Sequence, residues 1–367
     1  MAFPAGWNRK CKLTIDHTKL SGTVSSFPVL ITQENLPTSN NEIFDADGTY
    51  PADNGGGDVR FSSDSAGTTQ LACEVVSFVT NNNPAIGTAE IWVNVGSISS
   101  VVDTDIYVWY NNSGQTQPAA GDSFGSQAVW DSSFKIVSHL QQDPSGGAPQ
   151  MTDSTSNANS GTSSGMVSGD SVTGKITKGL NFDGTDNYIS TPSLTWHSSN
   201  SFTFEAWVKG AAQTLAMIIA RKTGVNPDCY ISSGNSNNTK ARFWVADLTT
   251  NNGGVESTAT AFDSTWHHIS GAFSNGSTVL YVDGESSGTN TNMSISLSGA
   301  EVLYYGARNV VPSEFFNGTI DEVRVSNTAK SADWVKASYN SQNSPSTFLT
   351  VGTPSGSSVR ILQPMAF

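Results

Sequence analysis

The sequence predicts an all-β protein, and its length allows two domains with separate cores. The 367 residues include 34 Gly and many Ser, Thr and Asn, so turns should be frequent and long helices rare. Apolar runs rich in β-branched and aromatic residues are short and recur along the chain. Residues 266–284 hold two such runs around Asn275-Gly276 and end at Asp283-Gly284, and both pairs tolerate the positive φ of tight hairpin turns.

The segment 266–284 is expected to be a β-meander inside a layered sheet. Ile269 and Phe273 point to one face of the pleat, whereas Trp266 and Ala272 point to the other. Because both faces carry apolar groups, neither should be freely solvated. The meander is therefore predicted to be central in the second domain.

Composition and charge exclude several classes of partner. Charged residues make up 13% of the chain, which predicts a surface of hydroxyl and amide groups. The net charge of −13, with only 18 Lys and Arg, argues against nucleic acid and anionic membranes. No segment is long and apolar enough to span a bilayer. The first residues show no signal peptide, unless Met1 is an added start after removal of a leader.

The three cysteines, Cys11, Cys73 and Cys229, fit no metal-binding spacing. We expect buried free thiols. A disulfide between Cys11 and Cys73 is the alternative, because both lie in strand-like runs of the first domain.

Residues 1–117 are predicted to form the first domain. Strands are expected at Lys10–Ile15, Phe27–Ile31, Val59–Phe61, Cys73–Val76, Ile91–Val95 and Ile106–Tyr110. This region resembles the DUF2341 domain family through Trp7-Asn8-Arg9-Lys10, Phe27-Pro28-Val29, Gly57-Asp58-Val59-Arg60-Phe61, Ile91-Trp92-Val93 and Tyr107-Val108-Trp109-Tyr110. The family usually has Tyr-Tyr-Gly-Asn where this chain has Trp109-Tyr110-Asn111-Asn112. The resemblance implies a β-sandwich architecture and says little about chemistry.

Residues 118–127 are predicted to be a connector, and residues 128–340 a second domain. The second domain resembles the laminin-G-like, concanavalin A-like jelly-roll family through Ser138-His139-Leu140, Asp153–Asn157, Gly179–Tyr188, Phe202–Val208, the meander and Phe316–Val325. The resemblance implies two antiparallel sheets packed face to face. One short helix is expected at Ser331–Ser338.

Residues 341–367 are predicted to be a tail that lies outside both resemblances. Phe348–Val351 and Val359–Leu362 have the composition of short strands. We expect the tail to dock onto a neighbouring subunit by strand addition.

The resemblance to the jelly-roll family also implies one structural calcium ion near the rim of the sandwich. Asp153, Asn157 and Asp321 are the expected ligands, because calcium prefers oxygen atoms and the first and last strands of a jelly roll pair. The alternative is that these residues only shape turns.

A sugar site needs an aromatic platform beside polar hydrogen-bonding groups. The candidate ligand-binding residues are Trp196, Tyr230, Trp244, Tyr304 and Tyr305. The alternative for each is a place in the core, where most aromatic residues of a sandwich lie.

No catalytic residues are predicted, and the protein is expected not to be an enzyme. Glycoside hydrolysis requires two carboxylates across a sugar cleft. Hydrolases of this fold class place them on one strand as Glu-x-Asp-x-Glu, a string that is absent from this sequence. Glu205 is a lone strand carboxylate in Phe204-Glu205-Ala206-Trp207.

These observations together predict a non-enzymatic structural or adhesive protein on a bacteriophage virion. It would decorate the capsid or belong to a tail or fibre, be assembled in the host cytoplasm, and display a lectin-like domain. Other virion proteins or identical subunits would contact its termini, and a cell-surface glycan would be its ligand. The alternatives are a secreted, extracellular bacterial carbohydrate-binding module and, less favoured, a glycoside hydrolase.

Overall fold

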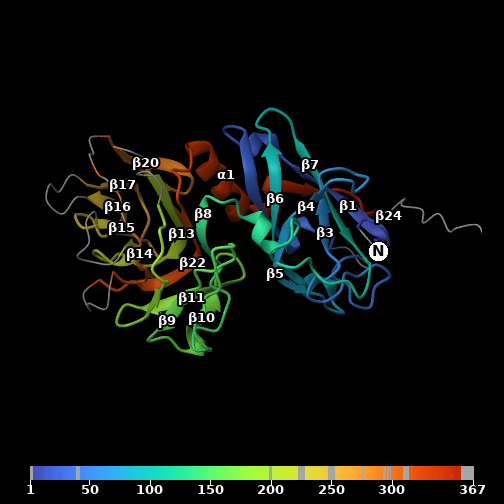
Figure 1. Ribbon diagram of the computed structural model, residues 1–367, viewed down its shortest axis with the longest axis horizontal. Coiled ribbons are helices and arrows are strands. Elements are labelled where there is room, and N and C mark those ends of the chain that lie inside the picture. The colour runs from blue at the N-terminus through green and yellow to red at the C-terminus, as the bar shows by residue number, and fades with distance from the viewer. Residues whose placement is uncertain are drawn as a thin grey trace, which may run out of the picture. The chain divides into compact units, whose positions relative to one another are not determined.

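The protein folds into two compact units in the computed structural model, residues 1–131 with 340–367 and residues 132–339. The structure describes residues 3–38, 42–197, 201–221, 228–246, 253–274, 276–291, 295, 297, 299–308 and 314–356. Every pair of strands in its ladders is antiparallel, as predicted for an all-β protein, and Figure 1 shows the strands of both units.

The first unit is a sandwich of a six-stranded and a three-stranded sheet. The larger sheet has the order β23-β1-β7-β3-β4, with β24 also paired to β1, and the smaller sheet has the order β2-β6-β5. Its strands are β1 (Arg9–Ile15), β2 (Val24–Thr32), β3 (Arg60–Ser62), β4 (Gln70–Leu71), β5 (Cys73–Val79), β6 (Thr88–Ile98), β7 (Thr104–Tyr110), β23 (Leu349–Val351) and β24 (Ser355–Gly356). The short helix α2 (Pro345–Phe348) leads directly into β23.

The C-terminal strands belong to the first unit. Val351 lies opposite Leu13, and Ser355 lies opposite Lys10, so both strands extend the sheet along β1 of their own chain. The first of the two strands expected in the tail is therefore present, whereas the second, Val359–Leu362, lies outside the described residues. Docking onto a neighbouring subunit stays a prediction.

All three cysteines are buried free thiols. Burial raises the pKa of the Cys11 thiol to about 11 and that of Cys73 to about 12. Burial also raises the pKa of Cys229. Because the reactive form of cysteine is the thiolate, these side chains act as small apolar core groups.

The second unit is a sandwich of an eight-stranded and a seven-stranded sheet. The orders are β10-β11-β22-β13-β18-β19-β20, with β8 paired to β22, and β17-β16-β15-β14-β21-β12-β9. The first sheet has β8 (Phe134–Ser138), β10 (Ser171–Thr173), β11 (Lys178–Asp183), β13 (Ser201–Lys209), β18 (Trp266–Ser274), β19 (Ser277–Val282), β20 (Glu285–Asn290) and β22 (Asn317–Ser326). The second has β9 (Thr162–Ser164), β12 (Tyr188–Ser190), β14 (Met217–Arg221), β15 (Asp228–Ser233), β16 (Lys240–Ala246), β17 (Val255–Thr260) and β21 (Leu303–Tyr305).

The predicted meander and the predicted helix are both present in the second unit. Strands β18 and β19 form a hairpin in which Ser274 lies opposite Ser277, and β13 covers the other edge of β18. The meander is therefore interior to its sheet, as its two apolar faces indicated. The helix α1 (Ala332–Asn343) begins one residue after the predicted start and runs further than predicted.

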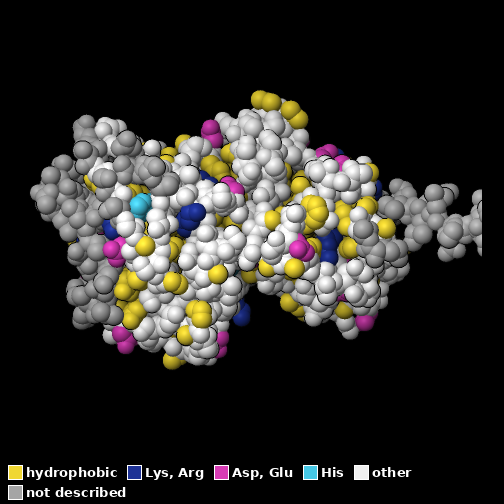
Figure 2. Space-filling view, viewed as in Figure 1, with side chains coloured by type: hydrophobic (Ala, Val, Ile, Leu, Met, Phe, Trp, Pro, Cys, Tyr) yellow, Lys and Arg dark blue, Asp and Glu magenta, His cyan; other side chains and the backbone are white. Residues whose placement is uncertain are grey.

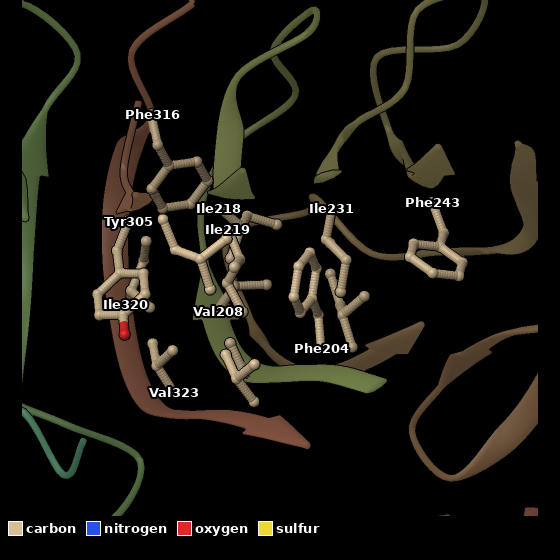
Figure 3. Close-up of a cluster of buried hydrophobic side chains, with 14 of the residues drawn as sticks. Phe204, Val208, Ile218, Ile219, Ile231, Phe243, Tyr305, Phe316, Ile320 and Val323 are labelled. Atoms are coloured by element: carbon tan, nitrogen blue, oxygen red, sulfur yellow. The ribbon is translucent and has the colours of Figure 1, made fainter. Parts of the chain in front are cut away.

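The two sheets of the second unit enclose one large apolar core. Figure 3 shows side chains from β13 and β22, such as Val208 and Ile320, pointing towards Ile219, Ile231 and Phe243 of the facing sheet. These side chains are fully buried. Because inward side chains occupy every second position, their neighbours along each strand face outward.

The visible surface carries few charges. In Figure 2 most of the described surface is neither hydrophobic nor charged, and the Lys, Arg, Asp and Glu side chains are scattered. No helix among the described residues is long and apolar enough to cross a membrane.

Candidate functional site

The outward face of the seven-stranded sheet carries the polar and aromatic groups of interest. In β16, Ala241, Phe243 and Val245 point into the core, so Arg242 and Trp244 point outward. The same alternation places Tyr230 of β15 on the outward face, where it joins a small apolar cluster that also contacts Trp244. Arg242 and Trp244 thus stand two residues apart on one face.

Three of the five predicted ligand-binding residues share this outward face. Tyr304 lies opposite Ala220, Ala220 lies opposite Tyr230, and Tyr230 lies opposite Trp244. Side chains that face each other across neighbouring strands project on the same side of a sheet. The three aromatic residues therefore belong to one row that crosses four strands.

Trp196 and Tyr305 are core residues instead. Trp196 is 0% exposed and Tyr305 is 1% exposed, and both belong to the main core of the second unit. Tyr305 follows Tyr304 in β21, so strand alternation sends its ring inward. The sequence could not tell which of two adjacent tyrosines faces out.

An arginine lies over each of the two neighbouring aromatic rings. The Arg242 guanidinium carbon is 4.1 Å from the centroid of the Trp244 ring, and that of Arg308 is 5.0 Å from the Tyr230 ring. The two rings are nearly parallel, with centroids 6.3 Å apart. Burial raises the pKa of Tyr230 to about 12, so its phenol is neutral at physiological pH. The paired cation–π contacts fix both guanidinium groups against the sheet.

A pocket of about 300 Å³ opens beside Trp244. We call it the Trp244 pocket; it is lined by Asn235, Ser236, Arg242, Trp244, Gly254, Val255 and Glu256. It is formed by β16, by the edge strand β17 with Gly254 before it, and by the loop that joins β15 to β16. The pocket combines an aromatic ring, one guanidinium, one carboxylate and amide and hydroxyl groups, which is a set of groups suited to a polar ring-shaped ligand.

Main-chain geometry shapes this pocket. The Glu256 carboxylate accepts hydrogen bonds from the main-chain N–H groups of Asn235 and Ser236 at 2.7 and 2.9 Å. Gly254 has a φ of +64°, and a Cβ atom there would lie 2.5 Å from the Trp244 ring. Only glycine fits such a position without strain, so Trp244 packs directly on bare main chain.

Tyr304 belongs to a second aromatic group on the same face. Its ring centroid is 5.9 Å from that of Tyr188, which is 6.5 Å from Phe315. Burial raises the pKa of the Tyr304 phenol. Two strands, β14 and β15, separate Tyr304 from Trp244, so the two residues serve different parts of the face.

The predicted calcium ligand Asp153 organises a loop. One of its oxygens accepts hydrogen bonds from the main-chain N–H groups of Val137 and Thr155, at 3.1 and 3.0 Å. The other accepts from the Thr155 hydroxyl at 2.9 Å and from the N–H of Asn159 at 2.8 Å. Burial raises the pKa of this carboxyl group. A calcium ion would have to compete with four donors here.

Asn157 and Asp321 are similarly engaged. The Asn157 amide donates to the main-chain carbonyl of Phe134 at 3.0 Å. Asp321 accepts hydrogen bonds from the N–H groups of Ile176 and Glu322, at 2.9 and 2.8 Å. The Asn157 contact is that of a turn-forming residue, whereas Asp321 lies within β22 and holds the main chain at Ile176. The calcium site stays a prediction.

Glu205 is a buried, ion-paired carboxylate. Burial acts to raise its pKa, but His268, Arg324 and the Ser338 hydroxyl hold the pKa at about 2. The residue is 2% exposed. A sugar-cleaving acid needs a raised pKa and access to its substrate, so the position of Glu205 is structural.

Arg242, Asn235 and Glu256 are candidate site residues that the sequence reasoning missed. The alternation Lys240, Arg242, Trp244 is a signal that could have placed Arg242 beside Trp244. No such signal exists for Asn235, because only the fold brings its loop to Glu256.

Comparison with known families confirms both resemblances in their order along the chain. Residues 55–131 match the domain of unknown function DUF2341, and residues 183–336 match the concanavalin A-like lectin/glucanases superfamily. No curated protein matches the chain significantly.

Several solved structures are similar to part of the chain. Domain 4 of AbnA, a GH43 extracellular arabinanase from Geobacillus stearothermophilus solved with arabinotriose, is 21% identical over 55% of this chain and 96% of that one, with a TM-score of 0.44. The binding domain of Paraclostridial Mosquitocidal Protein 1 is 13% identical over 57% and 52%, with a TM-score of 0.43. The receptor binding domain of botulinum neurotoxin mosaic serotype C/D is 13% identical over 57% and 51%, with a TM-score of 0.42.

Proposed function

We propose that the second unit is a carbohydrate-binding, adhesive domain and that the Trp244 pocket is its ligand site. The observation that supports this most directly is the set of groups that surround Trp244. An apolar ring stands in a polar pocket beside a guanidinium, a carboxylate and main-chain groups. Sugars present apolar C–H faces and rings of hydroxyl groups, and a site of this composition matches both.

The same pocket favours binding over cleavage. Glu256 is the one carboxylate among the described residues that line it. Hydrolysis of a glycosidic bond requires a pair of carboxyl groups about 5 to 9.5 Å apart. Glu205 is buried and ion-paired, so it does not supply the second.

A glycan array probed with the full-length protein tests the proposal. We expect binding to a defined set of sugars, and we expect Trp244→Ala to abolish it because the apolar contact is lost. Trp266→Ala is the matched control, since Trp266 is also a half-buried strand tryptophan but lies in the other sheet. Binding that both variants lose equally, or no binding to any sugar, would contradict the proposal.

We propose the surface of a bacteriophage virion as the setting, with the protein as a capsid decoration or tail fibre component. The polar, sparsely charged surface in Figure 2 supports a crowded, exposed setting. Neighbouring virion proteins or identical subunits would contact the termini, and a cell-surface glycan would be the ligand. Mass spectrometry of purified particles is the test, and absence of the protein from them would exclude this setting. A secreted bacterial glycan-binding protein is the second candidate.

A further inference from the structure

Arg242 is held in place by the sheet and by Trp244. Its guanidinium lies 4.1 Å from the Trp244 ring centroid and 5.9 Å from that of Tyr230. An arginine over an aromatic ring keeps its in-plane N–H groups available for an acceptor. The side chain is therefore pre-organised before any ligand arrives, which lowers the entropic cost of binding.

No carboxylate of the described residues forms an ion pair with Arg242. Glu256 lies directly across from it on β17, where an Arg–Glu pair is ordinarily favourable. One oxygen of Glu256 instead accepts the N–H groups of Asn235 and Ser236. Arg242 and Glu256 thus line the same pocket without forming an ion pair with each other.

Arg308 on the same face provides the contrast. Like Arg242 it lies over an aromatic ring, but it is ion-paired with Asp228 and, at 3.3 Å, with Glu314. The positive charge of Arg308 is therefore balanced by carboxylates of the protein itself. The two arginines have similar aromatic settings but differ in two respects. Of the two, Arg308 is ion-paired within the described residues, and Arg242 lines the Trp244 pocket.

From this contrast we propose that the Trp244 pocket selects an acidic sugar, with its carboxylate or sulfate bound by Arg242. The inference rests on the proposed function and specifies the ligand class of the same site. Arginine binds both anions through two parallel N–H donors. Glu256 accepts sugar hydroxyl groups, and Trp244 contacts the apolar face of the ring.

The arrangement distinguishes an acidic sugar from a simple anion. The protein has a net charge of −13, so its overall field does not attract anions. Glu256 repels any anion that approaches its side of the pocket. A ligand that carries its charge at one end and hydroxyl groups at the other satisfies both residues.

Isothermal titration of the full-length protein with four matched sugars tests the inference. The probes are trigalacturonate, its methyl ester, galactotriose and sulfated galactotriose. We expect at least one acidic trimer to bind about tenfold or more tightly than the uncharged trimers, because hydrogen bonds to charged groups are worth that much. The carboxylated and sulfated probes identify which anion is preferred. Inorganic sulfate should compete only weakly.

Variants locate the effect at one residue. Arg242→Gln should weaken acidic-sugar binding about tenfold and weaken it more than it weakens binding of the uncharged trimers, so the preference for acidic sugars should fall. Arg242→Lys keeps the charge and should give an intermediate affinity, because the two-pronged geometry is lost. Lys135→Gln is the control for net charge, since Lys135 lies on β8 of the other sheet and donates to Ser132.

Three other outcomes would each contradict the acidic-sugar inference, the role of Arg242 or both proposals. Equal affinity for acidic and uncharged trimers, with loss in Trp244→Ala, would refute the acidic-sugar inference and leave the proposed function standing. Equal loss in Arg242→Gln and Lys135→Gln would remove Arg242 as the anion-binding residue. Binding to none of the four sugars, together with an empty glycan array, would refute both proposals.

Discussion

The Arg324 guanidinium lies 3.5 Å from the Glu205 carboxylate inside the second unit, where both residues are 2% exposed. His268 approaches the same carboxylate oxygen at 3.3 Å, and the Ser338 hydroxyl donates to it at 2.9 Å. Arg324 also pairs with Glu322 at 2.7 Å. A buried charge is tolerated only when it is paired and hydrogen-bonded, so this network should be sensitive to the loss of any member.

Replacing Glu205 by glutamine should destabilise the protein. The change leaves Arg324 and His268 without the charge they face, and breaking a buried ion pair costs about 3–5 kcal/mol. Urea unfolding monitored by tryptophan fluorescence measures the change in free energy. Glu285→Gln is the matched control, because Glu285 is exposed and its ion pair among the described residues is with Lys336, so its loss should cost under about 1 kcal/mol. Equal effects of the two variants would contradict a structural role for the buried network.

The free energy of unfolding that Glu205 contributes should depend on pH. Its pKa is about 2 in the folded protein and 4.5 without the protein environment. The folded-state pKa is depressed, so the contribution is full above pH 4.5 and is lost as the pH falls from 4.5 towards 2. Unfolding curves of wild type and Glu205→Gln should therefore converge as the pH is lowered through this window. A difference in unfolding free energy that stays constant across the window would show that another effect of the substitution dominates.

Gly254→Ala should damage the Trp244 pocket. The substitution places a Cβ atom 2.5 Å from the Trp244 ring at a positive φ, so strain and a clash act together. We expect a loss of about 1 kcal/mol or more in unfolding free energy and a loss of sugar binding as the ring shifts. Gly169→Ala is the control, because a Cβ there meets nothing within 4 Å and no positive φ is involved. Unchanged sugar binding in Gly254→Ala would show that the position of Trp244 is not critical.

Leu349→Ala should loosen the sheet of the first unit. Leu349 is 0% exposed and opens β23, which pairs with β1 at Ile15. Truncation of a buried leucine costs about 2–5 kcal/mol. Hydrogen exchange of the β1 amides should accelerate. Val351 in the same strand is 36% exposed. The control variant Val351→Ala should therefore have little effect. Protection of β1 that survives Leu349→Ala would show that β23 is not needed to hold that edge.

The sequence predicted the elements that depend on local pattern. The meander at 266–284 follows from turn pairs between apolar runs, and the helix near Ser331–Ser338 follows from its polar start. Both are properties of neighbouring residues, which the chain order states directly. The two family resemblances rest on such local motifs as well.

The candidate site could be predicted only in part, because it depends on pairing between distant strands. Tyr304 and Tyr305 are alike in sequence, and only the register of β21 with β14 decides which ring faces out. The contrast between Arg242 and Arg308 likewise depends on Asp228 and Glu314, whose positions no local pattern gives. The attachment of the C-terminal strands to β1 spans more than three hundred residues of sequence and leaves no periodic signal.

The return of the chain to β1 has a consequence for biosynthesis. A nascent first half, once it has left the ribosome, lacks β23 until the whole second unit has been translated. At translation rates of about 5–20 residues per second, the unpaired edge of β1 stays open for on the order of ten seconds or more. Open strand edges recruit other chains. The second unit should therefore fold first, and a chaperone that shields β1 during that interval should raise the yield of native protein.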